Sequence, residues 1–407
     1  MERTGVSSMR IVVYELKNDK AAMSRLGWIN NATGNYVDAK YQIGSFNLNV
    51  PATRNNIEMI SEDRIFYIDD FYWGTVTGFK FEDDSQKRII VIGKQLTCWL
   101  NRRLILPPIE YVNASDDWCN YRVITSSDQK EDVNVQNQNN SPMGYEAVKG
   151  STETIMKYAV QNHMVNPVEE ARKIYGLKIA RDLERGNPDD AYMYRYVPLD
   201  TAIFTVGKAA KLGAKISGNP NKCEFVFDVI SQTDRTDGQS NNVPLILQVL
   251  RGNLESSGYT YDESDSYNTF YCIRSDSSEV WEQFIQTYHL DEVKKSGLQR
   301  RETSLTISVD SDSDNEYSEF AMMSKKEMEN YRPIENLQAV MSRKLQYRKD
   351  YNLGDIATVI LAFANVKADM EIVSVETTVS ENNTVRVATF GEEKISKFKL
   401  LQRRMSK

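Results

Sequence analysis

The sequence predicts an α+β protein of several domains, with a β-rich section at each end flanking an α-rich section and a mixed section. Alternation of apolar and polar residues with a period of two dominates the first and last quarters of the chain. Apolar residues three or four apart are common in the middle instead. At 407 residues the chain exceeds a single ordinary core, so roughly two to four domains are expected.

The first section, residues 1–106, is expected to be a β-rich domain with one helix. Period-two alternation predicts strands at residues 9–16, 41–50 and 65–68. Pro51 ends the second of these strands, because proline cannot donate to a ladder. The polar run at residues 30–35 predicts a turn before it.

The most regular stretch of this domain is residues 72–107, where two strands and a helix follow one another. Residues 75–80 alternate as in a strand, and the β-branched residues 88–92 predict a second one. The apolar spacing then becomes helical, so residues 94–103 are predicted to form a helix with one apolar stripe. We expect Trp99 on that stripe to be buried between the helix and the sheet.

Two sections follow, residues 107–198 and residues 199–303. The first is expected to be a helical domain with a polar surface loop at residues 126–142, and the second a mixed α/β domain. Apolar spacing predicts helices at residues 151–163, 167–186 and 199–213, with helical spacing again at 242–257 before a turn. Strands are predicted at residues 225–229 and 269–273.

The last domain, residues 304–393, is expected to be β-rich like the first. Strands are predicted at residues 304–309, 355–363, 371–379 and 384–390. One helix is predicted among them at residues 334–344, where Leu337, Val340 and Met341 align. A basic tail, residues 394–407, ends the chain, and both a frayed terminus and a short docking helix are open for it.

Composition argues against several classes of protein. The chain has 50 basic and 57 acidic residues and a net charge of −7, so no basic face that could neutralise DNA phosphates is expected. No apolar run approaches the ~20 residues that a membrane helix needs. The N-terminus lacks the apolar core of a secretion signal, so we expect assembly in a cytoplasm.

The residues that usually carry catalysis or bind metals are scarce and scattered. The chain has two histidines, His163 and His289, and four cysteines that form no C-x-x-C pair and are expected to be reduced and mostly buried, namely Cys98, Cys119, Cys223 and Cys272. No zinc-protease motif, nucleophile elbow or phosphate-binding loop is found in the sequence. We therefore predict no catalytic, cofactor-binding or metal-binding residue, and no enzymatic activity.

Three polar clusters have both a functional and a structural interpretation, and the structural one is favoured for each. Residues 234–238 are interpreted as a turn with an internal Arg–Asp pair. In residues 353–355, Gly354 would permit a turn that Asp355 caps. Residues 310–314 imitate the start of a calcium loop, but they lack its glycine and its final glutamate.

A series of short motifs resembles the siphophage tail-hub family, whose members sit at the tail tip of long-tailed phages. It begins with Gly93, Leu96, Leu100, Arg102 and Arg103, just after a strand pair that carries Gly74. Further motifs follow in the order of that family: Asn166-Pro167 with Arg172, Asp234-Arg235-Thr236 with Gln239, Gly252-Asn253-Leu254, Asn268, Arg300-Arg301-Glu302, Leu353-Gly354-Asp355 and Phe390-Gly391. Each motif is weak by itself, and their common order is the stronger signal. The polar segment at 126–140 and the basic tail depart from the pattern.

The resemblance implies a structural virion protein rather than an enzyme. It implies a trimeric ring in which the N- and C-terminal β-rich sections are two β-barrel-like tube domains that continue the lumen of a six-fold tail tube. The implied partners are a neighbouring tail-tube or distal-tail ring protein and a central tip protein. Genome DNA would only pass through, so an electronegative channel of acidic or neutral residues is expected.

Two alternatives from other classes remain open at this point. A tail-associated cell-wall hydrolase would need a catalytic domain, and the chain ends at Lys407, soon after the last β-rich section. A carbohydrate-binding receptor module would fit the 22 tyrosines, although no repeated aromatic stripe is present. Peptidoglycan turnover and glycan binding by the purified chain distinguish these alternatives from a structural hub.

Overall fold

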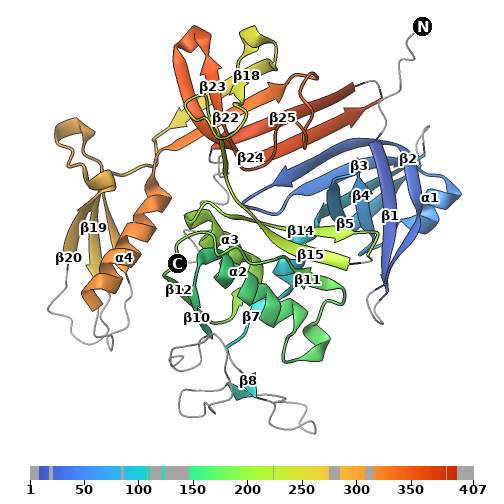
Figure 1. Cartoon of the computed structure of the whole chain (residues 1–407), viewed down its shortest axis with the longest axis horizontal. Helices are drawn as coiled ribbons and strands as arrows, with labels where there is room; N and C mark the ends of the chain where they lie inside the picture. Colours follow the sequence, from blue (N-terminus) through green and yellow to red (C-terminus); the bar gives the residue numbers. More distant parts are fainter. Residues whose placement is uncertain are drawn as a thin grey trace. The chain divides into compact units, whose positions relative to one another are not determined.

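The computed structural model is mostly β and describes residues 9–17, 22–83, 87–107, 109–110, 122–123, 146–222, 224–274, 285–307, 316–381 and 383–391 (Figure 1). Contacts divide the chain into two compact units, Met1–Ser257 with Ala339–Phe390, and Gly258–Gln338 with Gly391–Lys407. Each unit is described by itself below. The domain boundaries expected at residues 106, 198, 303 and 393 stay predictions.

The first unit begins with a closed six-stranded barrel in the order β1–β4–β5–β6–β3–β2, in which β2 pairs back with β1. Its strands are β1 (Met9–Lys17), β2 (Ala22–Ala39), β3 (Ser45–Pro51), β4 (Ile65–Ile68), β5 (Tyr72–Glu82) and β6 (Arg88–Gln95). A short helix, α1 (Arg54–Met59), lies between β3 and β4. The barrel is filled by apolar side chains that include Ile11, Tyr36, Leu48, Phe66 and Val91.

The turn predicted at residues 30–35 is wrong, because β2 runs through it without a break. Asn31 has φ 59° and Gly34 has φ 130°, so the strand bends there instead of reversing. Its first half pairs with β1, and its second half pairs with β3 on one side and β24 (Val366–Ser380) on the other. The polar residues therefore mark the point at which one long strand changes partners.

The two strands and helix predicted at residues 72–107 are present, with a shifted boundary. Strand β6 continues to Gln95, and a 3₁₀ helix, η1 (Leu96–Arg102), takes the place of the predicted α-helix. Trp99 is 4% exposed, as predicted, and its ring centroid lies 4.8 Å from that of Phe225. Phe225 lies on β15 (Glu224–Ile230), so the helix seals the barrel against a second sheet.

The glycines of this stretch are explained by close packing. The Phe46 ring lies so near that a Cβ added at Gly93 would stand 2.0 Å from its Cζ atom, and one at Gly74 would stand 2.6 Å from its Cε1 atom. Any larger residue at either position would displace the ring from the barrel core. Both glycines belong to the motif that begins the tail-hub resemblance.

The middle of the first unit is a mixed layer of helices and short strands. The helices predicted at 151–163 and 199–213 are confirmed as α2 (Thr152–Val160), continued by a π-helix at Gln161–Val165, and α3 (Leu199–Ala209). Ser151 caps α2 by accepting a hydrogen bond from the Thr154 backbone at 3.1 Å. The strands are β7 (Leu104–Ile105), β8 (Ile109–Glu110), β9 (Arg122–Val123), β10 (Glu146–Gly150), β11 (Leu177–Ile179), β12 (Asp190–Tyr194), β13 (Val197–Pro198), β14 (Gly213–Asn219) and β15.

The helix predicted at residues 167–186 is wrong. Only Glu170–Arg172 forms a 3₁₀ turn, and β11 follows it. Gly176 has φ 76°, which interrupts any helix at this point. Leu177 then pairs in parallel with Phe225, so tertiary strand pairing outweighs the helical spacing of the sequence.

The C-terminal part of the chain confirms three predicted strands of the first unit and corrects the helix predicted at 334–344, which begins in the second unit and ends in the first. The strands are β23 (Asp355–Leu361), β24 and β25 (Asn383–Gly391). The helix predicted at 334–344 is strand β22 (Ile334–Met341), because residues four apart, such as Leu337 and Met341, lie on one face in either conformation. Between Asn242 and Ser257, only Val249–Arg251 is helical, flanked by β17 (Ile246–Leu247) and β18 (Leu254–Asp262).

One continuous sheet extends from the barrel into the C-terminal strands through the pairing of β2 with β24 (Figure 1). Direct cross-strand partners share a face, and one such row crosses five strands: Ile92, Asn47, Asn35, Thr378 and Val385. We call the solvent-facing side of β6, β3, β2, β24 and β25 the open sheet face. Its residues are Ile90, Ile92, Lys94, Ser45, Asn47, Asn49, Thr33, Asn35, Val37, Glu376, Thr378, Val385 and Val387, none of them fully buried.

The second unit has a small sheet of three strands in the order β20–β19–β21. These are β19 (Thr269–Arg274), β20 (Ile285–His289) and β21 (Glu302–Ile307), and the helix α4 (Glu316–Met328) accompanies them. Phe270, Cys272 and Leu305 from the strands pack with Phe320 and Met328 from the helix. The unit thus has an apolar core of its own.

Several predictions concern residues outside the described ranges. These are the polar loop at 126–142, the acidic residues 310–314, and the basic tail at 394–407. Cys98 and Cys272 are free and buried, as predicted for the thiols, and burial raises the pKa of Cys98 to about 11. No helix in the described part of the chain is long and apolar enough to cross a membrane.

Candidate functional site

The most distinctive polar feature of the first unit is a set of charged side chains buried where its sections meet. We call it the ionic junction and define it by the residues Asp38, Lys40, Glu153, Lys157, Arg185, Lys215, Arg348 and Glu371. Asp38 and Lys40 come from the end of β2, Glu153 and Lys157 from α2, Lys215 from β14, and Glu371 from β24. Charges so deeply buried are rare unless each one is paired.

Asp38 is the most fully enclosed of these residues, with a side chain that is 0% exposed. Its carboxylate lies 3.3 Å from the Lys215 ammonium and also accepts a hydrogen bond from Arg348. The Tyr347 hydroxyl and the Gln95 amide donate to it at 2.9 and 3.0 Å. Burial raises the pKa of Asp38, but the two cations outweigh that effect, so its pKa is held below the usual value.

Lys40, two residues further along, is fully buried and pairs with Glu371. Glu371 also accepts hydrogen bonds from the Tyr41 hydroxyl at 2.9 Å and from the Gln232 amide at 2.7 Å. Lys40 additionally donates to the Lys211 carbonyl at 3.0 Å. Burial lowers the pKa of Lys40, and the Glu371 carboxylate partly restores it.

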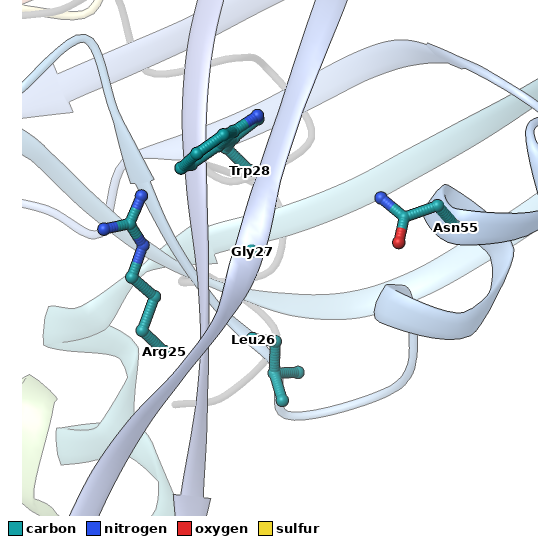
Figure 2. Close-up of a pocket in the computed structure, with 5 residues that line it drawn as sticks. All are labelled: Arg25, Leu26, Gly27, Trp28 and Asn55. Carbon is teal, nitrogen blue, oxygen red and sulfur yellow. The ribbon is translucent and has the colours of Figure 1, made fainter.

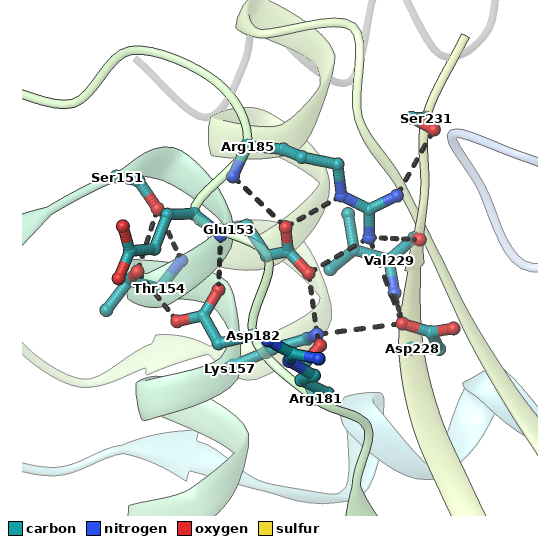
Figure 3. A network of polar contacts seen from close by, with 11 residues as sticks. Ser151, Glu153, Thr154, Lys157, Arg181, Asp182, Arg185, Asp228, Val229 and Ser231 are labelled. Atoms are coloured by element: carbon teal, nitrogen blue, oxygen red, sulfur yellow. Dashed lines mark hydrogen bonds and ion pairs between the residues drawn. The ribbon is translucent and has the colours of Figure 1, made fainter. Parts of the chain in front are cut away.

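Glu153 is the centre of a third group (Figure 3). It is fully buried on the first turn of α2, where Lys157 donates to it at 2.6 Å and the Arg185 guanidinium donates through two nitrogens at 2.7 and 2.9 Å. Burial raises the pKa of Glu153, but these hydrogen bonds outweigh it and lower the pKa to about 2. Arg185 also donates to the Ser231 hydroxyl and the Val229 carbonyl, which ties α2 to β15 and to the segment after it.

Gly354 connects the second and third groups. It has φ +87°, and a Cβ added there would lie 2.4 Å from the Ser231 carbonyl oxygen and 3.4 Å from the Lys40 ammonium. The predicted turn is therefore confirmed, and a side chain at this position would displace the junction. Asp355 caps the turn, as predicted, by accepting a hydrogen bond from the Asn352 backbone at 2.9 Å.

The internal Arg–Asp pair predicted for residues 234–238 is wrong. Arg235 pairs with Asp355 instead, at 2.8 Å. The cause is the parallel pairing of β16 (Thr233–Arg235) with β23, which brings Arg235 beside the start of that strand. Two motifs that are far apart in the sequence thus form a single contact.

Other motifs of the resemblance also make structural contacts. Arg103 donates to the Arg172 carbonyl at 2.8 Å, and Arg172 donates to the Leu104 carbonyl, so those two motifs bind each other. The Asn253 side chain accepts a hydrogen bond from the Gln248 N–H and donates one to the Ile246 carbonyl. It therefore fixes the link between β17 and η4. In the second unit, Asn268 accepts a hydrogen bond from the Arg301 backbone.

The two histidines differ in their surroundings. His163 is buried with its Nε2 atom 2.6 Å from a Glu146 carboxylate oxygen, a pairing that sequence reasoning missed because the partner is on a strand 17 residues away. His289 lies 3.3 Å from the Thr269 hydroxyl. In the described ranges, no group of three or more histidine, cysteine, aspartate or glutamate side chains is placed to hold a metal ion.

The chain matches a family model over residues 109–392, that of the Siphovirus ReqiPepy6 Gp37-like proteins. The chain belongs to this family. The match covers most of the chain and includes all of the ionic junction except Asp38 and Lys40. A comparison with curated proteins finds no match.

Solved structures of tail proteins share the fold of this family member. The 43 kDa tail protein of prophage MuSo2 from Shewanella oneidensis is 12% identical, with a TM-score of 0.53 over 94% of this chain and 98% of that one. The tail protein from Neisseria meningitidis MC58 is 11% identical, with a TM-score of 0.54 over 95% and 97%. Both alignments extend beyond the family match and include the N-terminal barrel. The chain thus belongs to a siphovirus protein family and has a fold that solved phage and prophage tail proteins share.

Proposed function

We propose that the chain is the hub protein at the tip of a phage tail. In this role three copies form a closed ring that adapts the tail tube to the tip complex and surrounds a channel for the genome. The observation that carries the proposal is the continuous sheet, because it joins the N-terminal barrel to the C-terminal strands in one surface. The C-terminal strands would act as the second tube domain of each subunit.

The composition of the open sheet face supports its use as a channel wall. Of its thirteen residues only Lys94 and Glu376 are charged, and Asn35 donates to the Glu376 carboxylate at 2.8 Å. Asparagine, serine and threonine supply most of the polar groups. A wall that lacks a cationic surface would let DNA slide past without strong binding to its phosphates. The electronegative channel expected from the sequence stays a prediction, because Lys94 and Glu376 leave the open sheet face itself without a net charge.

The ionic junction supports the same role mechanically. A ring at a tail tip must preserve the shape of its subunits while DNA and neighbouring proteins exert force on it. Buried ion pairs have strict geometric requirements, and breaking one leaves an uncompensated charge. We infer that the junction fixes the orientation of the barrel, the α2 layer and the C-terminal strands within each subunit. The chain would then act in the virion, after assembly in the host cytoplasm.

The oligomeric state tests the proposal first. Light scattering of the purified chain, alone and with the adjoining tail-ring protein, is expected to show a trimer, because closed rings are cyclic. A strict monomer in both samples contradicts the hub. Peptidoglycan turnover or binding on a glycan array would favour the hydrolase or the receptor module instead.

The channel wall has its own test. Replacing Asn47 and Asn35 with lysine adds two cations to the open sheet face of every subunit, so genome ejection is expected to slow while particles still assemble. Asn221→Lys, at an exposed position in the turn between β14 and β15, is the matched control and should leave ejection unchanged. Normal ejection from the N35K/N47K particles would remove the open sheet face from the channel.

A further inference from the structure

The outer surface of the barrel carries an open hollow between β2 and α1, lined by both polar and apolar side chains (Figure 2). Arg25, Leu26, Gly27 and Trp28 of β2 line it, together with Asn55 of α1, and its volume is about 440 Å³. Trp28 is 56% exposed and Leu26 is 40% exposed. We call these five lining residues the Trp28 patch.

The backbone under the patch is firmly held. Val13 pairs with Gly27 and Tyr14 pairs with Arg25, so Leu26 is the extra residue of a β-bulge. A bulge of this kind re-aims the side chains of its strand. Gly27 packs on α1, because a Cβ added there would lie 2.8 Å from the Met59 sulfur. The patch is thus a preformed surface on a closed barrel.

The apolar character of the patch continues into the core of the first unit. Trp28 stands opposite Val12, Val12 opposite Tyr67, and Tyr67 opposite Trp73, so the four share one face of the barrel. Tyr67 and Trp73 stack at 4.2 Å, and Trp73 is 4% exposed under β14. At one end of this row Trp73 is packed in an interface, and at the other end Trp28 is exposed to solvent. An exposed apolar surface with a polar rim marks a contact with another molecule.

The positive charge of Arg25 indicates which chemical group the partner must supply. The Arg25 guanidinium lies 4.9 Å from the centre of the Trp28 ring. Among the described residues, Arg25 forms no ion pair with a carboxylate. Arg54, on the neighbouring helix, is already paired with Glu58 at 3.0 Å. A carboxylate on the partner would therefore form an ion pair with Arg25 rather than with Arg54.

We propose that the Trp28 patch binds a segment of another protein of the same tail, in which one apolar side chain fills the hollow and a neighbouring carboxylate pairs with Arg25. Tryptophan and arginine are the residue types that most often dominate protein–protein binding energy. A sugar fits less well, because Arg25 covers one face of the ring and Asn55 is the one uncharged polar side chain in the hollow. That the partner is a protein of the same tail rests on the proposed function, whereas the description of the patch does not.

The test measures binding between this chain and each other structural protein of the tail, purified singly, by biolayer interferometry. Trp28→Ala and Arg25→Glu are each expected to weaken binding to one of these proteins by at least about tenfold. The matched controls are Arg54→Glu, a charge reversal on an exposed arginine nearby, and Val168→Ser, at an apolar residue that is 64% exposed elsewhere. Both controls should bind like the unaltered chain, and thermal melts verify that all four variants fold.

A reciprocal charge exchange identifies the partner group. A carboxylate of the bound protein changed to lysine is expected to restore binding to the Arg25→Glu chain and to weaken binding to the unaltered chain. Equal binding by all variants overturns the inference while leaving the hub intact. If the Trp28→Ala and Arg25→Glu variants lose self-association instead, the occupant is a second copy of the chain. If Trp28→Ala loses glycan binding, the occupant is a sugar. Either result overturns the inference. Binding to no tail protein contradicts the hub as well.

Discussion

The ion pairs of the two units use the same residue types in opposite surroundings. In the first unit, Asp38 and Glu153 are fully buried, and each carboxylate is enclosed by several donors. In the second unit, Asp291 pairs with Arg332 at 2.7 Å, but the two side chains are 60% and 38% exposed. Arg301 and Glu263 are similar, at 38% and 47%. Exposed pairs contribute little because water screens them, whereas a buried pair that loses one partner leaves a charge without compensation.

This difference explains which unit depends on its charges. The second unit has its own apolar core around Phe270 and Phe320. Its ion pairs Asp291–Arg332 and Arg301–Glu263 lie outside that core and are partly exposed to solvent. The first unit has separate apolar clusters, and its ionic junction joins side chains of β2, α2, β14 and β24. We expect the charges of the first unit to be decisive for its arrangement, and those of the second to be replaceable.

The largest effect should come from Asp38→Ala. It leaves the largely buried Lys215 and the partly exposed Arg348 without their carboxylate, so the free energy of unfolding is expected to fall by about 3–5 kcal/mol. Asp291→Ala is the matched variant in the second unit and should cost at most about 1 kcal/mol. Urea unfolding of both variants measures the difference. Equal losses would erase the distinction between the two sets of ion pairs.

Trp99→Ala tests whether apolar packing matters as much as charge in the first unit. Trp99 seals η1 against β15, and removing a buried aromatic side chain is expected to cost about 3–5 kcal/mol. Trp28→Ala is the control, and because Trp28 is exposed its effect should stay within about 0.5 kcal/mol. Thermal unfolding gives both values. A small loss at Trp99 would leave the ionic junction as the main source of cohesion.

The pH dependence of stability should reveal Glu153. Its pKa is lowered to about 2 in the folded chain, from an ordinary value of 4.5, so its stabilising contribution is complete above about pH 4.5. That contribution is lost as the pH falls through about 2. Glu153→Gln is expected to destabilise the chain near neutral pH and to flatten this part of the acid limb. Glu58→Gln, at an exposed pair with Arg54, is the control and should leave the acid limb unchanged.

The smallest effect on stability is expected from the basic tail, residues 394–407, which lies outside the described ranges. Deleting it should leave the unfolding free energy unchanged but weaken assembly, and more so at high salt, because exposed charges are screened. Incorporation of the truncated chain into tails is the measurement. Incorporation equal to that of the full chain would show that the tail has no docking role.

Local spacing was sufficient to predict much of the fold. The strands around residues 72–92, the burial of Trp99, the helices at α2 and α3, and the turn at Gly354 all depend on neighbours along the chain. Period-two or helical patterns and the backbone freedom of glycine report such features directly. The order of short motifs also indicated the phage-tail family.

The wrong predictions share one physical cause. Residues 167–186 and 334–344 have spacing compatible with a helix, but strands β11 and β22 form there instead and bury Leu177 and Leu337. The polar run at 30–35 resembles a turn, yet β24 and β3 extend β2 through it. In each case a partner far away in the sequence provides hydrogen bonds that outweigh local preference.

The sequence by itself determined the β-rich character of the first and last quarters, the mildly acidic charge and the scarcity of histidine and cysteine. Only the tertiary structure decided which charges meet. Asp38 finds Lys215 across 177 residues and Arg348 across 310, and Arg235 finds Asp355 across 120. No periodicity marks such pairs, because each depends on the bends and registers of several strands at once. The junction and the open sheet face arise where β2 leaves the barrel to pair with β24, a step that long-range pairing alone determines.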